Sequence, residues 1–166
     1  MQRLIFVLTA CLLLVAACGL GGSDYQDAVL DGVSSLNRNK PEEALESFNR
    51  AISIDPTRAD GYLGRANTLN TLGRYRESLK DYDRVIEIDP TRANAYVNRG
   101  IAFSQLGEYE SAIADYEKGL ELDPEIDDAP GFLQRLFDDK TPNRDKGIRK
   151  HLEYLKEQVQ KKDRKS

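Results

Sequence analysis

The sequence predicts an all-α fold: a short solenoid of three helical hairpins followed by capping helices at the C-terminus. Two observations support this prediction. The dipeptide Asp-Pro recurs every 34 residues, beginning at Asp55, Asp89 and Asp123, and a fixed period of this size is typical of stacked repeats of one supersecondary unit. Between these dipeptides, Leu-Gly at Gly73 and Gly107 divides the period. Glycine after a helix end and proline after the next one predict two helices per period.

Three copies of this hairpin follow one another at residues 25–58, 59–92 and 93–126. The second and third copies are identical at eleven of their 34 positions. The first copy is weaker, since Asn39 and Pro41 stand where the other copies have glycine and tyrosine. Proline in the first turn suits the start of its second helix. We also expect Thr57 and Thr91 to cap the first helices that follow them.

These repeats resemble the tetratricopeptide repeat family, whose pattern combines aromatic, small and proline positions with Leu-Gly. The positions of the third copy that carry the resemblance are Tyr96, Arg99, Gly100, Phe103, Ala112, Tyr116, Gly119 and Pro124. The resemblance covers residues 25–126 and implies that small residues allow close helix crossings while aromatic residues fill the space between hairpins. Most tyrosines, Tyr96 among them, are therefore expected to serve packing rather than ligand binding.

The resemblance further implies that the first helix of each repeat lines an inner, concave face that binds a protein or peptide. The N-terminal end of this face is apolar, with Leu30 and Val33 among its residues. Its centre is rich in amides, which can both donate and accept hydrogen bonds along an extended peptide; the alternative is a merely hydrated face. The expected groove residues are Asp60, Leu63, Asn67, Asn70, Asn94, Val97, Asn98, Ile101 and Gln105.

Some members of the family hold a C-terminal carboxylate with lysine, arginine and asparagine. Asn67 and Asn98 match the two asparagines of that clamp. Leu63, Asp128 and Phe132 stand at the positions that need cations. A carboxylate clamp is therefore not expected.

Arginine and aspartate recur together with the period, as Arg65 with Asp81 and Arg99 with Asp115. An antiparallel hairpin brings each arginine near its aspartate. This pattern favours one repeated ion pair per hairpin over a ligand-binding role.

The N-terminus has the features of an export signal. A short positive start precedes an apolar stretch that ends at Ala17 and is too short to span a bilayer. Residues 1–17 resemble a bacterial lipoprotein signal peptide, which implies cleavage before Cys18 and lipid attachment to its thiol. Residues 18–24 are expected to form a flexible tether. The alternative is an ordinary secretory signal. In some bacteria, an aspartate after the lipidated cysteine holds a lipoprotein at the inner membrane. Gly19 stands at that position here, so we expect the protein at the outer membrane, facing the periplasm.

Residues 127–166 contain no clear fourth repeat and are expected to form capping helices and a basic tail. One short helix is expected around Phe132 and Phe137. A second expected helix is polar except for an apolar stripe along one side. This pattern suits a capping helix with one solvent-exposed face better than a helix lying on a membrane. The stripe consists of Ile148, Leu152, Leu155 and Val159.

Composition narrows the function further. The chain has 28 acidic and 24 basic residues and a net charge of −4, which disfavours nucleic-acid binding. His151 is the only histidine, and no phosphate loop or metal-binding motif is present. We therefore expect no enzyme activity, no cofactor and no metal site.

The sequence as a whole predicts a membrane-anchored scaffold or adaptor in the bacterial cell envelope. Its partner is an envelope protein or peptide that no residue identifies. A structural protein that self-associates through its repeats, as a homo-oligomer, is the alternative.

Overall fold

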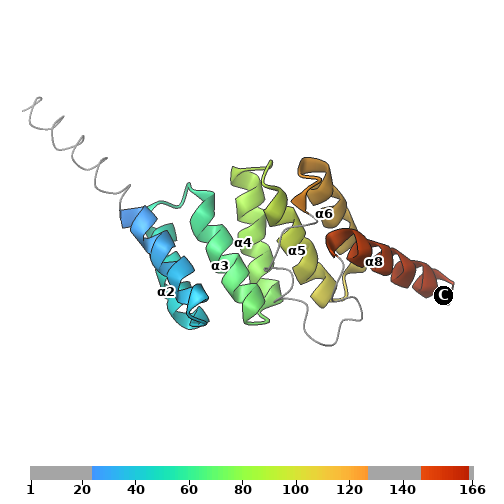
Figure 1. The fold of residues 1–166 in the computed structure, drawn as a ribbon, viewed down its shortest axis with the longest axis horizontal. Coiled ribbons are helices and arrows are strands. Elements are labelled where there is room, and N and C mark those ends of the chain that lie inside the picture. The colour runs from blue at the N-terminus through green and yellow to red at the C-terminus, as the bar shows by residue number, and fades with distance from the viewer. Residues whose placement is uncertain (1–23, 127–146, 165–166) are drawn as a thin grey trace, which may run out of the picture.

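The computed structural model describes residues 24–126 and 147–164, and its regular structure within these ranges is entirely helical. The predicted signal at 1–17, residues 18–23 of the predicted tether and the short helix around Phe132 lie outside the described residues. Asp24, the last residue of the predicted tether, instead begins the first described helix. Figure 1 shows the helices side by side in chain order, with the last at the C-terminal end. The helices are residues 24–37, α2 (Pro41–Ile54), α3 (Ala59–Thr71), α4 (Tyr75–Ile88), α5 (Ala93–Gln105), α6 (Tyr109–Leu122) and α8 (Gly147–Asp163). The all-α solenoid predicted from the sequence is confirmed.

Each hairpin packs against the next through its second helix. Helix α2 contacts α3, α4 contacts α5, and α6 contacts α8 in the same manner. Helix α8 therefore occupies the place that the first helix of a fourth hairpin would take.

Polar contacts show that α8 runs antiparallel to α6. Arg149 donates to the carbonyl of Pro124 at 3.1 Å, near the end of α6. About two helical turns further along α8 each time, Lys156 pairs with Glu117 at 2.6 Å and Lys162 lies 3.8 Å from Glu110.

The apolar stripe of α8 covers the last hairpin. Ile148, Leu152 and Leu155 are buried in one cluster with Val97 and Tyr116. The prediction of a capping helix is confirmed for α8.

One aromatic residue of each second helix fills the junction with the following hairpin. Phe48, Tyr82 and Tyr116 occupy equivalent positions and are all at most 1% exposed. A Cβ at Gly32 or Gly64 would overlap the ring of Phe48, so glycine allows the two first helices to approach it.

Tyr96 does not share this burial. It is only half-buried, and its hydroxyl donates to the carbonyl of Pro90 at 3.2 Å. Tyr96 therefore contributes less to the core than the buried aromatic residues of the second helices.

The predicted helix ends are confirmed. Gly73 and Gly107 adopt φ of 71° and 78°, and Asn39, which replaces the glycine in the first hairpin, adopts φ of 59°. Asparagine is among the few other residues that tolerate this conformation.

The predicted threonine caps are wrong. Helix α3 begins after Arg58 without a side-chain cap. The hydroxyl and the backbone N–H of Thr57 both donate to Asp55, at 2.6 and 3.0 Å. Thr91 and Asp89 repeat this arrangement. The aspartate of Asp-Pro therefore closes the turn itself, and these bonds lower the pKa of Asp55 and Asp89.

Candidate functional site

The expected groove residues lie on the first helices of the second and third hairpins, α3 and α5, but they differ in accessibility. Asn94 and Gln105 are exposed, and Asp60, Leu63 and Asn67 are partly exposed. The remaining four are at most 4% exposed and cannot contact a ligand in this conformation: Asn70, Val97, Asn98 and Ile101. The expectation of a groove that includes these four is corrected.

The buried asparagines belong to a hydrogen-bonded network between the second and third hairpins. We call Asn67, Asn70, Ser78, Tyr82 and Asn98 the amide cluster. Asn70 donates to the Tyr82 hydroxyl at 3.0 Å and to the carbonyl of Asn98 at 3.2 Å, and its oxygen accepts from Ser78 at 2.5 Å. The physical reason for the burial is therefore that the amides satisfy polar groups inside a junction, where an unpaired one would be costly.

Asn67 forms the edge of the amide cluster toward solvent. Its side-chain oxygen accepts from the hydroxyl of Tyr82 at 2.8 Å and from the amide of Asn98 at 3.0 Å. Both bonds require the oxygen to face inward, so the NH₂ group of Asn67 is left to donate elsewhere. The cluster therefore presents one oriented donor at the surface.

Charged and apolar side chains also belong to the predicted inner face. Asp60 is held by Arg92 at 2.7 Å. At the N-terminal end, Leu30 is 55% exposed and Val33 44% exposed. These two large apolar side chains on the helix over residues 24–37 give the predicted inner face an accessible apolar end.

The two predicted ion pairs are confirmed. Arg65 forms two hydrogen bonds to Asp81, both of 2.7 Å. Arg99 binds Asp115 in the same way, at 2.8 and 2.7 Å. The bond to Asp115 raises the pKa of Arg99, as expected for a forked guanidinium–carboxylate pair.

Each arginine also binds the preceding hairpin, which sequence reasoning missed. Arg65 donates to the Asn49 oxygen and Arg99 to Asp83, both at 2.7 Å. Asn49 and Asp83 stand 34 residues apart, so a recurring polar position on the second helices was the available signal.

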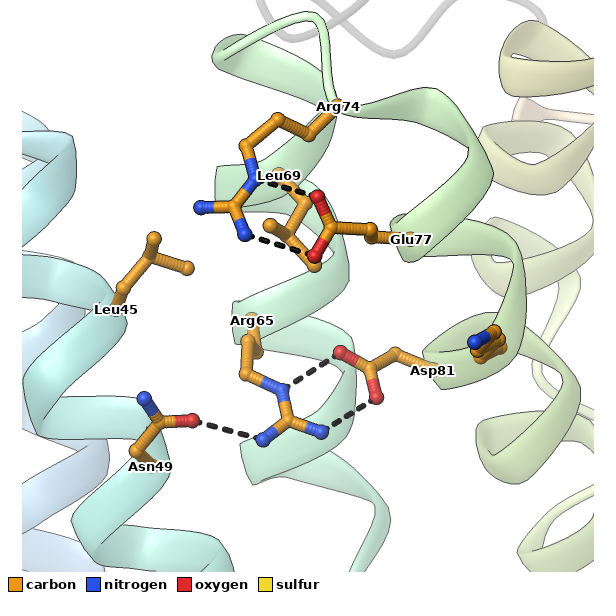
Figure 2. A pocket seen from close by; sticks show the side chains of 8 residues that line it. Leu45, Asn49, Arg65, Leu69, Arg74, Glu77 and Asp81 are labelled. Atoms are coloured by element: carbon orange, nitrogen blue, oxygen red, sulfur yellow. Dashed lines mark hydrogen bonds and ion pairs between the residues drawn. The ribbon is translucent and has the colours of Figure 1, made fainter.

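A cavity of about 390 Å³ opens beside the first of these arginines. It lies among α2, α3 and α4 (Figure 2). Arg65 and Leu69 are about half a helical turn from Leu63 and Asn67, so the cavity lies on the opposite, convex side of α3. Its lining consists of Leu45, Asn49, Arg65, Leu69, Arg74, Glu77, Lys80 and Asp81.

His151, for which the sequence analysis gave no role, lies on α8 and is buried against α5 and α6 at 5% exposure. Its Nε2 lies 3.0 Å from the hydroxyl of Ser104, and its ring meets that of Tyr116 edge to face. Burial lowers the pKa of His151 to about 4. The signal that sequence reasoning overlooked is its place beside the apolar stripe, one residue before Leu152.

Among residues 24–126 and 147–164, no helix is long and apolar enough to cross a membrane. The same residues contain no group of three or more potential metal ligands.

Comparison with known families identifies the repeats. Models described as "Tetratricopeptide repeat" match residues 93–126 and 32–58, and one described as "TPR repeat" matches residues 66–107. An uncharacterized protein of Methanocaldococcus jannaschii is 44% identical over 46 residues, which is 28% of this chain. The match spans about half (54%) of that relative's length.

Solved structures of the same fold are also similar. The Arabidopsis OM64 TPR domain superposes with a TM-score of 0.63 at 24% identity, covering 70% of this chain and 97% of the domain. The TPR2B domain of yeast Sti1 in a pHsp70 complex superposes with a TM-score of 0.65 at 23% identity, covering 82% of this chain and 98% of that chain. The second TPR domain of human RPAP3, in complex with the HSP70 peptide SGPTIEEVD, superposes with a TM-score of 0.61 at 26% identity, covering 70% of this chain and 94% of that chain.

Proposed function

This chain is a tetratricopeptide repeat protein, and we propose that it is a scaffold that binds a peptide segment of a partner protein on the inner face of its repeats. The observation that carries the proposal is the exposure of Val33, which occupies in the first hairpin the position that Asn67, with its oriented amide, occupies in the second; Leu30 is exposed one turn before it. Two of the similar structures contain peptides or peptide complexes of Hsp70 proteins, which supports a peptide as the ligand.

The chemistry of this face favours an extended segment with an apolar residue at one end. Leu30 and Val33 offer apolar surface that water would otherwise cover. The NH₂ group of Asn67 suits a backbone carbonyl, since the oxygen of that amide is already occupied by two donors. Leu63, which is partly exposed, lies one helical turn before Asn67 on α3 and adds apolar surface beside that amide.

The ligand is held without a clamp for a terminal carboxylate. Asn98, one of the two matching asparagines, is 4% exposed and bonded to Asn67. Leu63 replaces a cation. An internal segment therefore fits this face better than an acidic C-terminus.

We further propose that lipid on Cys18 anchors this scaffold to a bacterial envelope membrane. The apolar stretch ending at Ala17 supports this proposal. The first described helix begins at Asp24, so a tether of six residues would keep the repeats close to the bilayer. Cys18→Ser is expected to abolish incorporation of labelled fatty acid. Unchanged labelling and membrane fractionation of this variant would contradict the anchor.

Site-specific photo-crosslinking in native membranes tests the binding face. A photoreactive phenylalanine at Val33 or Leu63 is expected to give a defined crosslinked species. The matched control is the same probe at Arg84, an exposed position on α4. Crosslinks of equal yield at Arg84, or none at Val33 and Leu63, would contradict binding on the inner face.

Self-association is the second candidate, and one observation favours it. Leu30 and Val33 lie on the first described helix, which has no preceding hairpin among the described residues to cover it. Light scattering over a range of concentrations separates the candidates. Association that Val33→Asp abolishes would establish the oligomer, whereas a monomer at all concentrations would exclude it.

A further inference from the structure

The convex cavity between α2 and α4 differs from its counterpart one repeat later in ways that helix packing does not require. We propose that it is a second binding site, for an acidic peptide segment of a partner protein that places a Glu or Asp carboxylate beside an aliphatic residue. This site goes beyond the inner face, because it lies on the opposite side of α3.

Two donors face the cavity from opposite sides. The oxygen of Asn49 accepts from Arg65, and arginine can only donate, so the NH₂ group of Asn49 must point away from it. Figure 2 shows that nitrogen turned toward the space beside Leu45. Arg74 uses its Nε and Nη2 to bind Glu77, both at 2.7 Å. Figure 2 shows its remaining nitrogen directed toward α2.

The lining has an excess of positive charge on a protein of net charge −4. Three cations, Arg65, Arg74 and Lys80, stand against the carboxylates of Glu77 and Asp81. Lys80 forms no ion pair with any residue in the described ranges. An anionic group is therefore the complementary ligand.

The two arginines are bound with different strength. Arg65 is held by Asp81, which is 8% exposed, and by Asn49, so it is fixed in place. Arg74 and Glu77 are 46% and 57% exposed. An exposed pair of this kind contributes little to stability, so Arg74 can exchange part of its contact with Glu77 for a ligand carboxylate.

Apolar surface lies between the donors. Leu45 on α2 is partly exposed and supplies this surface, while Leu69 on α3, which is 5% exposed, lines the floor of the cavity; both are labelled in Figure 2. A free phosphate would leave this surface unused, whereas an aliphatic side chain next to a carboxylate would cover it. The volume of about 390 Å³ lies within the usual range of ligand pockets.

The next repeat keeps the fold but loses these features. At the equivalent positions Asp83 replaces Asn49, Phe103 replaces Leu69, and Ala114 replaces Lys80. Glu108 and Ser111 replace Arg74 and Glu77. The counterpart therefore has a larger side chain at its floor and negative charge at its rim. These natural replacements supply the test variants.

Binding is tested on the full-length chain in detergent with a fluorescein-labelled hexapeptide of alternating leucine and glutamate. Fluorescence anisotropy is expected to show binding that weakens with salt. Lys80→Ala is expected to weaken it about threefold, as for one exposed ion pair. Arg74→Glu with Glu77→Ser and Lys80→Ala, the residue types of the next repeat, is expected to weaken it by about tenfold or more.

Three comparisons make the result decisive. The same peptide with glutamine in place of glutamate is expected to bind about tenfold more weakly. Leu69→Phe, which narrows the cavity, is expected to weaken binding without altering the circular dichroism spectrum. Lys118→Ala on α6 removes one exposed cation elsewhere and is expected to leave affinity unchanged. Equal losses with Lys118→Ala, or equal binding of the glutamine peptide, would overturn the proposal.

The position of the site is checked by backbone amide chemical shifts during titration. Shifts at Asn49, Leu69 and Lys80 are expected. Shifts confined to Leu63, Asn67 and Asn94 would assign the peptide to the inner face, overturning this site while supporting the proposed function. Full displacement of the peptide by equimolar inorganic phosphate would show a simple anion site and would also overturn it. Absence of any chemical-shift change at Asn49, Leu69 and Lys80 would likewise overturn the proposed site.

Discussion

The two C-terminal junctions of the solenoid are each built around a tyrosine at the equivalent repeat position, but the hydroxyl of this tyrosine is hydrogen-bonded in only one of them. At the junction of the second and third hairpins, Tyr82 exchanges hydrogen bonds with Asn67 and Asn70. At the junction of the third hairpin with α8, the hydroxyl of Tyr116 is buried without a hydrogen-bond partner among the described residues. The first junction is therefore specified by directional bonds, and the second by apolar contact.

Residue replacement explains this difference. Asn67, Asn70 and Ser78 of the second hairpin correspond to Ile101, Ser104 and Ala112 of the third. The third hairpin has thus lost the groups that would serve its tyrosine. It gains instead an apolar cluster that includes Ile101 and Leu155. The comparison teaches that one repeat framework accepts either type of junction, and that α8 depends on burial of apolar surface.

Removal of α8 is expected to have the largest effect. Deleting residues 145–166 exposes the cluster that contains Ile148, Leu152 and Leu155. Each such side chain contributes roughly 1.5–3 kcal/mol, so the loss is about 5 kcal/mol or more. Urea denaturation measures it, with deletion of residues 161–166 as the control. A long truncation that unfolds at the same urea concentration as the control would show that α8 is no cap.

Mild acid is expected to weaken the α8 junction next. His151 has a pKa of about 4 in the folded protein, against about 6.5 in an unfolded chain. The unfolded chain therefore binds the proton first, so stability is complete above pH 6.5 and is lost as pH falls toward 4. The loss approaches about 3 kcal/mol.

His151→Gln is the control for this pH dependence. Its unfolding free energy is expected to vary less than that of the wild type between about pH 6.5 and 4. The carboxylates of Asp55, Asp89 and Glu77, whose pKa values are lowered, begin to lose their contribution near the acid end of that window, but they do so equally in both proteins. Identical profiles for the two proteins would contradict the role of His151.

Truncation of the amide cluster is expected to have the third-largest effect. Asn70→Ala removes three hydrogen bonds and leaves Ser78, Tyr82 and the carbonyl of Asn98 with fewer partners. We expect a loss of about 2–3 kcal/mol. The equivalent Ser104→Ala is expected to cost about 1 kcal/mol or less. Similar values from thermal unfolding of the two variants would remove the distinction between the junctions.

The tyrosine hydroxyls provide the smallest and most direct contrast. Tyr82→Phe is expected to cost about 1–2 kcal/mol, because Asn67 and Asn70 lose a partner. Tyr116→Phe removes a buried hydroxyl that lacks a partner and is expected to be neutral or slightly stabilising. Chemical denaturation of both variants tests this, and a larger cost for Tyr116→Phe would reverse the comparison.

The amide cluster also shows why part of the candidate site was misplaced from sequence. Asparagines on an amphipathic helix are ordinarily assigned to the solvated face. Here Asn70 and Asn98 are buried because Tyr82 places a hydroxyl in the junction. The bond between Asn70 and Tyr82 joins the two helices of one hairpin, and that between Asn98 and Asn67, 31 positions apart, joins two hairpins, so no local pattern reveals the burial.

The burial of His151 could not be predicted from the sequence either. Its residue type suggests a surface or catalytic group, yet the position of α8 against Ser104 and Tyr116 decides its burial. Thr57 was misassigned for a related reason, since Asp55 competed successfully for its hydroxyl. A capping prediction considers one helix end, whereas the turn offered a stronger, charged acceptor.

The hairpins, their 34-residue period, their glycine turns, the Arg–Asp pairs and the apolar stripe of α8 are predictable from the sequence, because each depends on residues of one hairpin or one helix face. The packing of the helices, in contrast, sets which asparagines are buried, directs the donor of Asn67 to the surface, and opens a cavity with excess positive charge beside Asn49 and Lys80. These features depend on how successive hairpins stack, since burial and hydrogen-bond partners are properties of the space between helices.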